Sequence, residues 1–193
     1  MMAASSTAEA PRALPGDSDV WVFVIGDMLI FSAYFAAYLF VDRSQDHALF
    51  LESQKHLSQD LGIVNTLVLL TSSLFVARSV QAAKAGDHAA AARRLTTGGL
   101  FGSAFLCIKA FEWTSKIAGG ITLTTNAFFM HYYMLTSVHV AHVLLGLVFL
   151  SLARRELQRA SAPNLGLIEA GGIYWHMVDF LWILIFALLY LMR

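Results

Sequence analysis

His176 and Asp179 lie three residues apart in the last long apolar stretch of the chain, residues 173–192. That spacing puts both side chains on one face of a helix, about one turn apart. An ionisable side chain at membrane depth costs roughly 2.5–3.5 kcal/mol on insertion scales, so both are expected to face partners inside a helix bundle. Trp175, next to His176, suits the aromatic belt at a membrane surface.

A second histidine pair, His139 and His142, has the same spacing within residues 127–153. Neutral imidazoles can bind zinc, copper or haem iron, and His142 could face His176 as a haem ligand. A carboxylate-bridged di-iron bundle would need a Glu-x-x-His motif, which the sequence does not contain. Two interpretations remain open: a membrane redox or metal-binding protein that uses these three histidines, or histidines that hydrogen-bond to carboxylates and backbone groups.

The remaining polar side chains at membrane depth lie in three other apolar stretches. Lys109 and Glu112 form one helical stripe with Lys116, so Glu112 can neutralise either lysine or contact a substrate or a lipid head group. Asp27 is either a packing contact or part of a proton relay or lipid site. Asn65 suits a hydrogen bond between helices. A small proton channel built on Asp27 and Glu112 is a further alternative.

Composition places these residues in a membrane protein. Of 193 residues, 58% are hydrophobic and 13% are charged, whereas soluble domains contain about 25% charged residues. The net charge of zero provides no electrostatic basis for nucleic-acid binding. The single cysteine, Cys107, allows neither an intrachain disulfide nor a cysteine metal cluster.

Five apolar segments indicate an all-α bundle of five transmembrane helices, because each has roughly the 20 residues that cross a ~30 Å hydrocarbon core. We expect one membrane domain over 19–193, a short interfacial helix at 48–51, and a polar, mobile segment over 1–18. The five segments are 20–41, 61–83, 95–117, 127–153 and 173–192.

The distribution of lysine and arginine predicts how the helices are oriented. One side of the predicted membrane has seven basic residues and the other has four. The positive-inside rule therefore puts the N-terminus in the cytoplasm and the C-terminus in the periplasm. The seven are Arg12, Lys84, Arg93, Arg94, Arg154, Arg155 and Arg159, and the four are Arg43, Lys55, Lys116 and Arg193.

Several ordered motifs resemble subunit III of the haem–copper oxidases, the cytochrome c oxidase subunit III family. The most extensive is Glu-Ala-Gly-Gly-Ile-Tyr-Trp-His-Met-Val-Asp-Phe-Leu-Trp at 169–182, similar to the final-helix signature of that family. The N-terminal segment, 14–28, resembles the five-helix members associated with bacterial nitric oxide reductase. Other matching blocks are Asn-Thr at 65–66, Gly-Asp at 86–87, Lys-Ala-Phe-Glu-Trp at 109–113 and His-Val-Ala-His-Val-Leu-Leu-Gly at 139–146.

The resemblance implies a non-catalytic subunit or accessory protein of a terminal oxidase or a nitric oxide reductase in the bacterial inner membrane. Such a subunit holds no haem, copper or other metal. It stabilises a catalytic membrane subunit and the phospholipid bound to that subunit. The catalytic subunit carries haem and copper or non-haem iron. Asp27 matches a family carboxylate that supports proton delivery or lipid contact. Structural polar contacts between helices are implied for Asn65, Lys109, Glu112, His139, His142, Trp175, His176 and Asp179.

Overall fold

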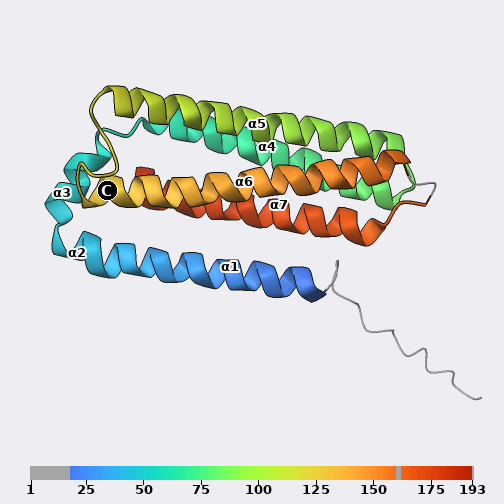
Figure 1. Ribbon diagram of the computed structural model, residues 1–193, viewed down its shortest axis with the longest axis horizontal. Coiled ribbons are helices and arrows are strands. Elements are labelled where there is room, and N and C mark those ends of the chain that lie inside the picture. Colours follow the sequence, from blue (N-terminus) through green and yellow to red (C-terminus); the bar gives the residue numbers. More distant parts are fainter. Residues whose placement is uncertain (1–17, 160–161, 193) are drawn as a thin grey trace, which may run out of the picture.

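The computed structural model describes residues 18–159 and 162–192, and every regular element within these ranges is helical (Figure 1). The predicted all-α fold is therefore confirmed. The predicted polar segment 1–18 lies outside the described residues except for Ser18, where the first helix begins. The elements are α1 (Ser18–Ala37), the π-helical turn η1 (Tyr38–Asp42), α2 (Arg43–Gln45), α3 (His47–Gln54), α4 (Gln59–Lys84), α5 (His88–Ala118), α6 (Ala127–Arg159), α7 (Leu165–Phe186) and the π-helical turn η2 (Ala187–Leu191).

Four long helices form an antiparallel bundle, and α1 lies along one side of it (Figure 1). In the bundle α4 packs against α5 and α7, and α6 packs against the same two helices. The tight turn from α4 to α5 contains Gly86 at a φ of 81°, a left-handed conformation that favours glycine. Helix α1 packs mainly against α7 and continues through η1 and α2 toward the short helix α3.

The helices extend further than the apolar segments from which they were predicted. Helix α5 begins at His88 rather than at 95, and α7 begins at Leu165 rather than at 173. Capping side chains set these starts, because Asp87 accepts a hydrogen bond from the backbone of Ala90 at 2.9 Å and Asn164 caps α7 in the same way. The predicted starts at 95 and 173 were therefore wrong. They were read from the apolar runs, which show only the part of each helix suited to lipid, and both helices begin before those runs.

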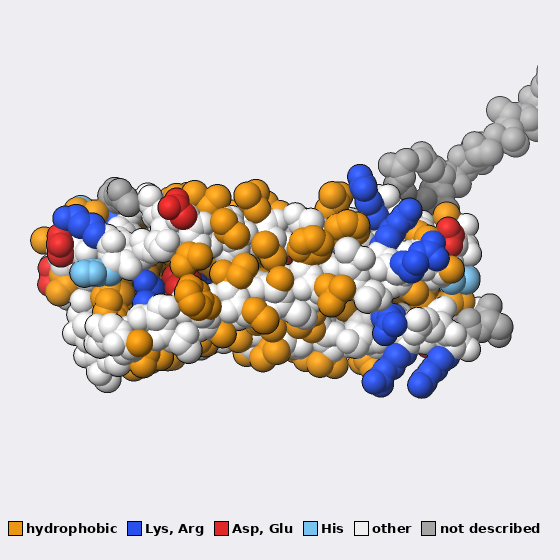
Figure 2. Space-filling model, turned by 90° about the horizontal axis from the view of Figure 1, so that it is seen from above, with side chains coloured by type: hydrophobic (Ala, Val, Ile, Leu, Met, Phe, Trp, Pro, Cys, Tyr) orange, Lys and Arg blue, Asp and Glu red, His pale blue; other side chains and the backbone are white. Residues whose placement is uncertain are grey.

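The outer surface of the long helices is apolar through the middle of the molecule, and charged side chains gather at its two ends (Figure 2). Within the described residues, four helical stretches are long and apolar enough to cross a membrane: Asp19–Gln45, Gln59–Lys84, Ala127–Arg159 and Leu165–Leu191. The chain is therefore a multi-pass membrane protein. Helix α5 has 31 residues but is less apolar, since it carries Arg93, Arg94, Lys109, Glu112 and Lys116.

The short helix predicted at 48–51 exists as α3, which lies at the same end of the bundle as the α5–α6 connection (Figure 1). Its Phe50 is buried and packs edge-on against Phe128 of α6, with ring centroids 5.7 Å apart. On its exposed side Lys55 lies 2.6 Å from Glu52, and this ammonium group lowers the pKa of the Glu52 carboxyl. Both charges face solvent, which marks this end as one that water reaches.

Candidate functional site

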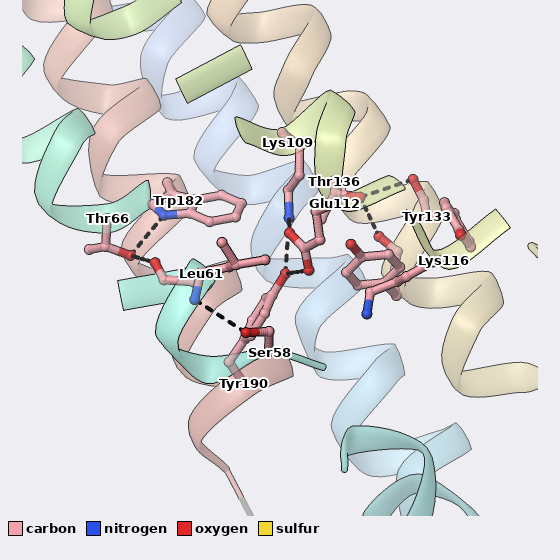
Figure 3. A network of polar contacts seen from close by, with 12 residues as sticks. Ser58, Leu61, Thr66, Lys109, Glu112, Lys116, Tyr133, Thr136, Trp182 and Tyr190 are labelled. Atoms are coloured by element: carbon pink, nitrogen blue, oxygen red, sulfur yellow. Dashed lines mark hydrogen bonds and ion pairs between the residues drawn. The ribbon is translucent and has the colours of Figure 1, made fainter. Parts of the chain in front are cut away.

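A closed polar cluster lies inside the bundle, where α5 meets the end of α7 (Figure 3). Nζ of Lys109 is 2.8 Å from Oε2 of Glu112 and donates to the hydroxyl of Tyr190 at 3.0 Å. The Tyr190 hydroxyl in turn donates to Oε1 of Glu112 at 2.6 Å. The lysine and glutamate side chains are 1% and 4% exposed. The structure thus forms the predicted ion pair and adds a tyrosine to it.

The position of Tyr190 depends on the π-helical turn η2. Met192 donates its backbone N–H to the carbonyl of Ala187, the i-to-i+5 bond that defines such a turn and re-aims the side chains within it. The aromatic rings of Trp182 and Tyr132 complete the cluster, with centroids 4.8 and 5.2 Å from Nζ of Lys109. The cluster is electrically neutral and its charged groups are satisfied internally, so its geometry serves to join helices.

Lys116 does not share Glu112, although the spacing allowed it. Its Nζ donates to the backbone carbonyl of His56 at 2.9 Å and so joins the end of α5 to the loop after α3. Glu112 therefore pairs with Lys109 and Tyr190 and not with Lys116. Each of its two oxygens accepts one of these hydrogen bonds, so neither is open to a substrate or a lipid head group.

Asp27 of α1 contacts His142 of α6. Oδ2 of Asp27 lies 3.1 Å from Nε2 of His142, and the two side chains are 15% and 18% exposed. Nδ1 of the same imidazole lies 2.8 Å from the carbonyl oxygen of Val138, which can only accept a hydrogen bond. Nδ1 therefore carries a hydrogen, and a hydrogen bond between Nε2 and Oδ2 needs one further proton. With that proton the pair is neutral overall and suits a membrane interior.

A second histidine of α6 holds the other end of α1. Nδ1 of His131 is 2.9 Å from the hydroxyl of Tyr34, while Nε2 lies 3.1 Å from Oδ2 of Asp42, at an angle outside hydrogen-bond geometry. The ring of Tyr38 packs edge-on against the imidazole at 5.3 Å. Tyr38 and Asp42 begin and end η1, so a π-helical turn shapes this contact as one shapes the Lys109 cluster.

His139 and Asn65 have no polar contact of the predicted kind. His139 is fully buried beside Phe105 and Trp182, and neither of its ring nitrogens has a hydrogen-bond partner among the described residues. The buried amide of Asn65 is also unpaired within the described part of the chain. Its neighbour Thr66 instead accepts a hydrogen bond from the indole of Trp182 at 3.0 Å (Figure 3).

Trp175 is not in a surface belt, which corrects the prediction made from its sequence position. Its indole Nε1 also has no hydrogen-bond partner among the described residues, so the implied polar contact is not formed. Trp175 is fully buried, and its indole fills space next to glycines on two other helices. A Cβ atom at Gly102 of α5 would come within 2.6 Å of this ring, and one at Gly146 of α6 within 2.8 Å. The aromatic side chain therefore packs in the core, because both facing residues lack a side chain.

His176 and Asp179 share a helix face, as predicted, but they are not equally buried. Nδ1 of His176 lies 2.6 Å from the hydroxyl of Ser73 on α4 and 3.9 Å from Oδ2 of Asp179. The histidine side chain is 43% exposed, whereas that of Asp179 is 5% exposed. The pair thus lies at the α4–α7 interface, with the imidazole on the outer surface.

The three histidines of the metal-binding alternative have different surroundings. His139 lies between aromatic rings, His142 contacts Asp27, and His176 contacts Ser73. In the part of the chain that the structure describes, no group of three or more histidine, cysteine or acidic side chains could hold a metal ion. The three histidines therefore do not come together in one site.

Sequence reasoning missed several side chains of these polar contacts, namely Tyr34, Asp42 and Tyr190. Each is a polar or hydroxyl-bearing side chain within or next to an apolar stretch, which is the signal that could have drawn attention to it. Pairing them with their partners requires knowledge of which helices are neighbours. The spacing of residues within one helix does not contain that information.

Comparison with known proteins assigns these features to a family. A family model described as cytochrome c oxidase subunit III matches residues 17–193. Cytochrome c oxidase subunit 3 of Synechocystis sp. is 33% identical over 177 residues, which cover 90% of this chain and 74% of that protein. The corresponding subunit of Bacillus sp. strain PS3 is 30% identical over 178 residues, covering 89% of this chain and 83% of that protein.

A longer relative is the heme-copper oxidase subunit I+III of Aeropyrum pernix. It is 29% identical over 186 residues, which cover 90% of this chain. The chain spans only 22% of the length of that relative.

Proposed function

Because the chain belongs to the cytochrome c oxidase subunit III family, we propose that it is a non-catalytic membrane subunit of a haem–copper oxidase, stabilising the catalytic subunit I. The family match over residues 17–193 carries this conclusion. The printed name of the Aeropyrum pernix relative combines subunits I and III in one protein, which supports subunit I as the partner. Haem and copper belong to that partner in this proposal, and the present chain contributes its packing surface.

The polar groups inside the bundle support a structural role. Lys109, Glu112 and Tyr190 satisfy one another, and Asp27 is paired with His142. The proton-channel alternative would need a path between Asp27 and Glu112. These residues lie on different helices, and each contacts its own set of partners.

We propose five membrane crossings, with α5 as the fifth beside the four apolar helices. Its buried Lys109–Glu112 pair is neutralised inside the bundle, so these charges do not prevent α5 from crossing. Basic side chains cluster at the end that contains the α4–α5 turn (Figure 2). The positive-inside rule then places this end and the start of α1 in the cytoplasm of a bacterium, and the other end in the periplasm. Lys84, Arg93, Arg94, Arg154, Arg155 and Arg159 lie at the first end, and Arg43, Lys55 and Lys116 at the other.

We also propose that a phospholipid chain occupies the cavity between α1, α6 and α7. This cavity has a volume of about 500 Å³, and its apolar lining includes Phe23, Leu145, Phe149 and Tyr174. Asp27 lies one helical turn along α1 from Phe23, which lines this cavity. Asp27 is therefore a better candidate than Glu112 for lipid contact or proton delivery. Glu112 is closed off by Lys109 and Tyr190.

The test is purification of the tagged chain from its native membrane in mild detergent, followed by visible spectroscopy of the complex and of the chain stripped of its partners. We expect haem in the complex and none in the stripped chain. Haem or iron that stays with this chain would overturn the proposal, and so would a complex without a haem-containing subunit.

The identity of the partner enzyme is a finer question. The relatives named above are oxidase subunits, whereas association with a nitric oxide reductase stays a prediction from the N-terminal motif. Oxygen consumption and nitric oxide consumption by the same purified complex separate these two assignments.

A further inference from the structure

We propose that the catalytic subunit docks on the face of the bundle formed by α4 and α7 around Ser73 and His176. In this arrangement a transmembrane helix of that subunit places a hydrogen-bonding group against Nε2 of His176. The inference rests on the proposed function and deepens it, because it assigns the surface through which the two subunits meet.

The depth of His176 is the first observation. The residue lies near the middle of the helical stretch Leu165–Leu191, and Ser73 lies near the middle of α4. Ser73 lies ten residues from the nearer end of the apolar segment 61–83, about 15 Å at 1.5 Å per residue, and its contact with His176 gives the depth of the imidazole. A bilayer core is about 30 Å thick, so the Ser73–His176 contact lies well inside the hydrocarbon.

The exposure of His176 is the second observation. Its side chain is 43% exposed, whereas those of Asp27, His142 and Asp179 at comparable depths are 18% exposed or less. Nδ1 of His176 has Ser73 as a partner, but Nε2 has no hydrogen-bond partner among the described residues. Lipid tails can neither donate nor accept a hydrogen bond, so an imidazole facing them is costly.

Exposed serines on other faces do not have this requirement. Ser103 on α5 donates to the carbonyl of Gly99 in its own helix, and Ser151 on α6 donates to that of Leu147. Such hydroxyl groups are satisfied without an outside partner, so lipid can cover them. The α4–α7 face differs, because its imidazole needs a polar group supplied by another protein segment.

The shape of this face suits a helix. A groove of about 220 Å³ runs between α4 and α7, and its lining includes Ala77, Val80, Gly172 and Ile173 beside His176. Ala77 is small and only partly buried, and a small residue at such a position lets a neighbouring helix approach closely. Lys84 and Glu169 close the groove toward the basic end with an ion pair of 2.9 Å.

The partner is assigned as the catalytic subunit because a polar group must complement the imidazole and because an oxidase relative unites subunits I and III in one chain. A transmembrane helix of subunit I can supply that group at the required depth. A phospholipid would place its polar head at the membrane surface, far from His176. A second copy of this chain is the remaining occupant, and the experiment includes it as an outcome.

The test uses tagged full-length chains expressed in the native membrane. His176→Leu removes the hydrogen bonds, and Ala77→Trp blocks the groove. His176→Gln keeps a hydrogen-bonding side chain. Ala110→Trp introduces the same bulk on the exposed side of α5 and serves as the matched control. The readouts are the haem subunit recovered per tagged chain and the thermal stability of the stripped chain.

We expect His176→Leu and Ala77→Trp each to lower the recovered haem at least tenfold, while His176→Gln and Ala110→Trp stay within twofold of wild type. The stripped His176→Leu chain should keep most of the wild-type thermal stability, because within the chain it loses only the contact to Ser73. A tenfold loss of haem then reports on docking and not on unfolding of the chain. Normal haem recovery by both His176→Leu and Ala77→Trp would overturn the inference and leave the proposed function intact.

Two further outcomes identify a different failure. If the wild-type chain recovers no haem subunit, the proposed function fails and this inference fails with it. The second outcome is detected by cross-linking, in which an Ala77→Cys chain in a Cys107→Ser background is oxidised in the membrane. A disulfide-linked dimer of the tagged chain would assign the face to a second copy and overturn docking of the catalytic subunit.

Discussion

Asp27 of α1 and His142 of α6 lie 3.1 Å apart in the structure, and the imidazole is oriented by a second contact to the carbonyl of Val138. The helix that carries Asp27 is otherwise largely exposed and apolar. Polar contacts to two histidines of α6 therefore hold α1 in place at two positions along its length. Asp27 contacts His142, and Tyr34, nearer the end of α1, contacts His131.

Replacing Asp27 should show how much its contact with His142 contributes to the docking of α1 on the bundle. Asp27→Val removes the hydrogen bond and should weaken the docking of α1 by about 0.5–1.7 kcal/mol, the range for polar contacts between membrane helices. Asp27→Asn can donate to Nε2 and should lose less. Hydrogen exchange of the α1 backbone in the purified chain measures the difference, with Ile25→Val on the exposed side as control. Equal exchange in all three variants would show that the contact does not hold α1.

Alanine at Gly102 or Gly146 should destabilise the bundle. The added Cβ would come within 3 Å of the buried Trp175 ring, which other side chains hold on all sides. Overpacking of this kind costs about 1–3 kcal/mol. Gly99→Ala is the matched control on α5, because its Cβ would meet only Leu147 at 3.9 Å. Thermal unfolding in detergent should separate the variants, and equal midpoints would contradict tight packing around Trp175.

Removing one charge of the Lys109–Glu112 pair should cost more than removing both. Lys109→Met leaves a carboxylate buried without its cation, a change that costs about 3–5 kcal/mol. The double variant Lys109→Met with Glu112→Leu leaves no buried charge and should recover part of that loss. Denaturant titration of the purified chain gives both values. A double variant less stable than Lys109→Met would mean that the pair itself is strongly stabilising.

Two serines of α4 should contribute to its packing on α5. Ser72 donates to the carbonyl of Gly98 and Ser79 to that of Ala91, each at 2.7 Å across the interface. Alanine at either position should cost about 1 kcal/mol. Ser103→Ala removes a hydroxyl that bonds within its own helix, and we expect a change close to zero. The comparison uses the same unfolding assay, and similar losses at all three positions would argue against a specific role for the interface.

The features that sequence predicted well are those that depend on residues close together in the chain. The Lys109–Glu112 pair follows from helical spacing. The start of α5 at His88, which the Asp87 cap sets, was missed because the prediction began the helix at the apolar run. The all-α fold follows from long apolar segments that lipid forces into helices. Local patterns and the bilayer therefore account for most of the architecture.

Other features depend on residues that meet only in the folded bundle. Trp175 was assigned to a surface belt because nothing near it in sequence shows that Gly102 and Gly146 make space for its ring. Tyr190 reaches the Lys109 cluster through a π-helical turn, which an apolar run does not predict. The opposite exposures of His176 and Asp179 likewise depend on where α4 lies.

The Lys109 cluster also has a consequence for biosynthesis. Tyr190 is 81 residues downstream of Lys109, beyond two further helices. When the ribosome has just completed α5, its lysine and glutamate can neutralise each other, but the hydroxyl and the rings that enclose them have not yet been made. For the proposed crossing of α5, we therefore expect the helix to settle in the membrane only once α7 and η2 have been made.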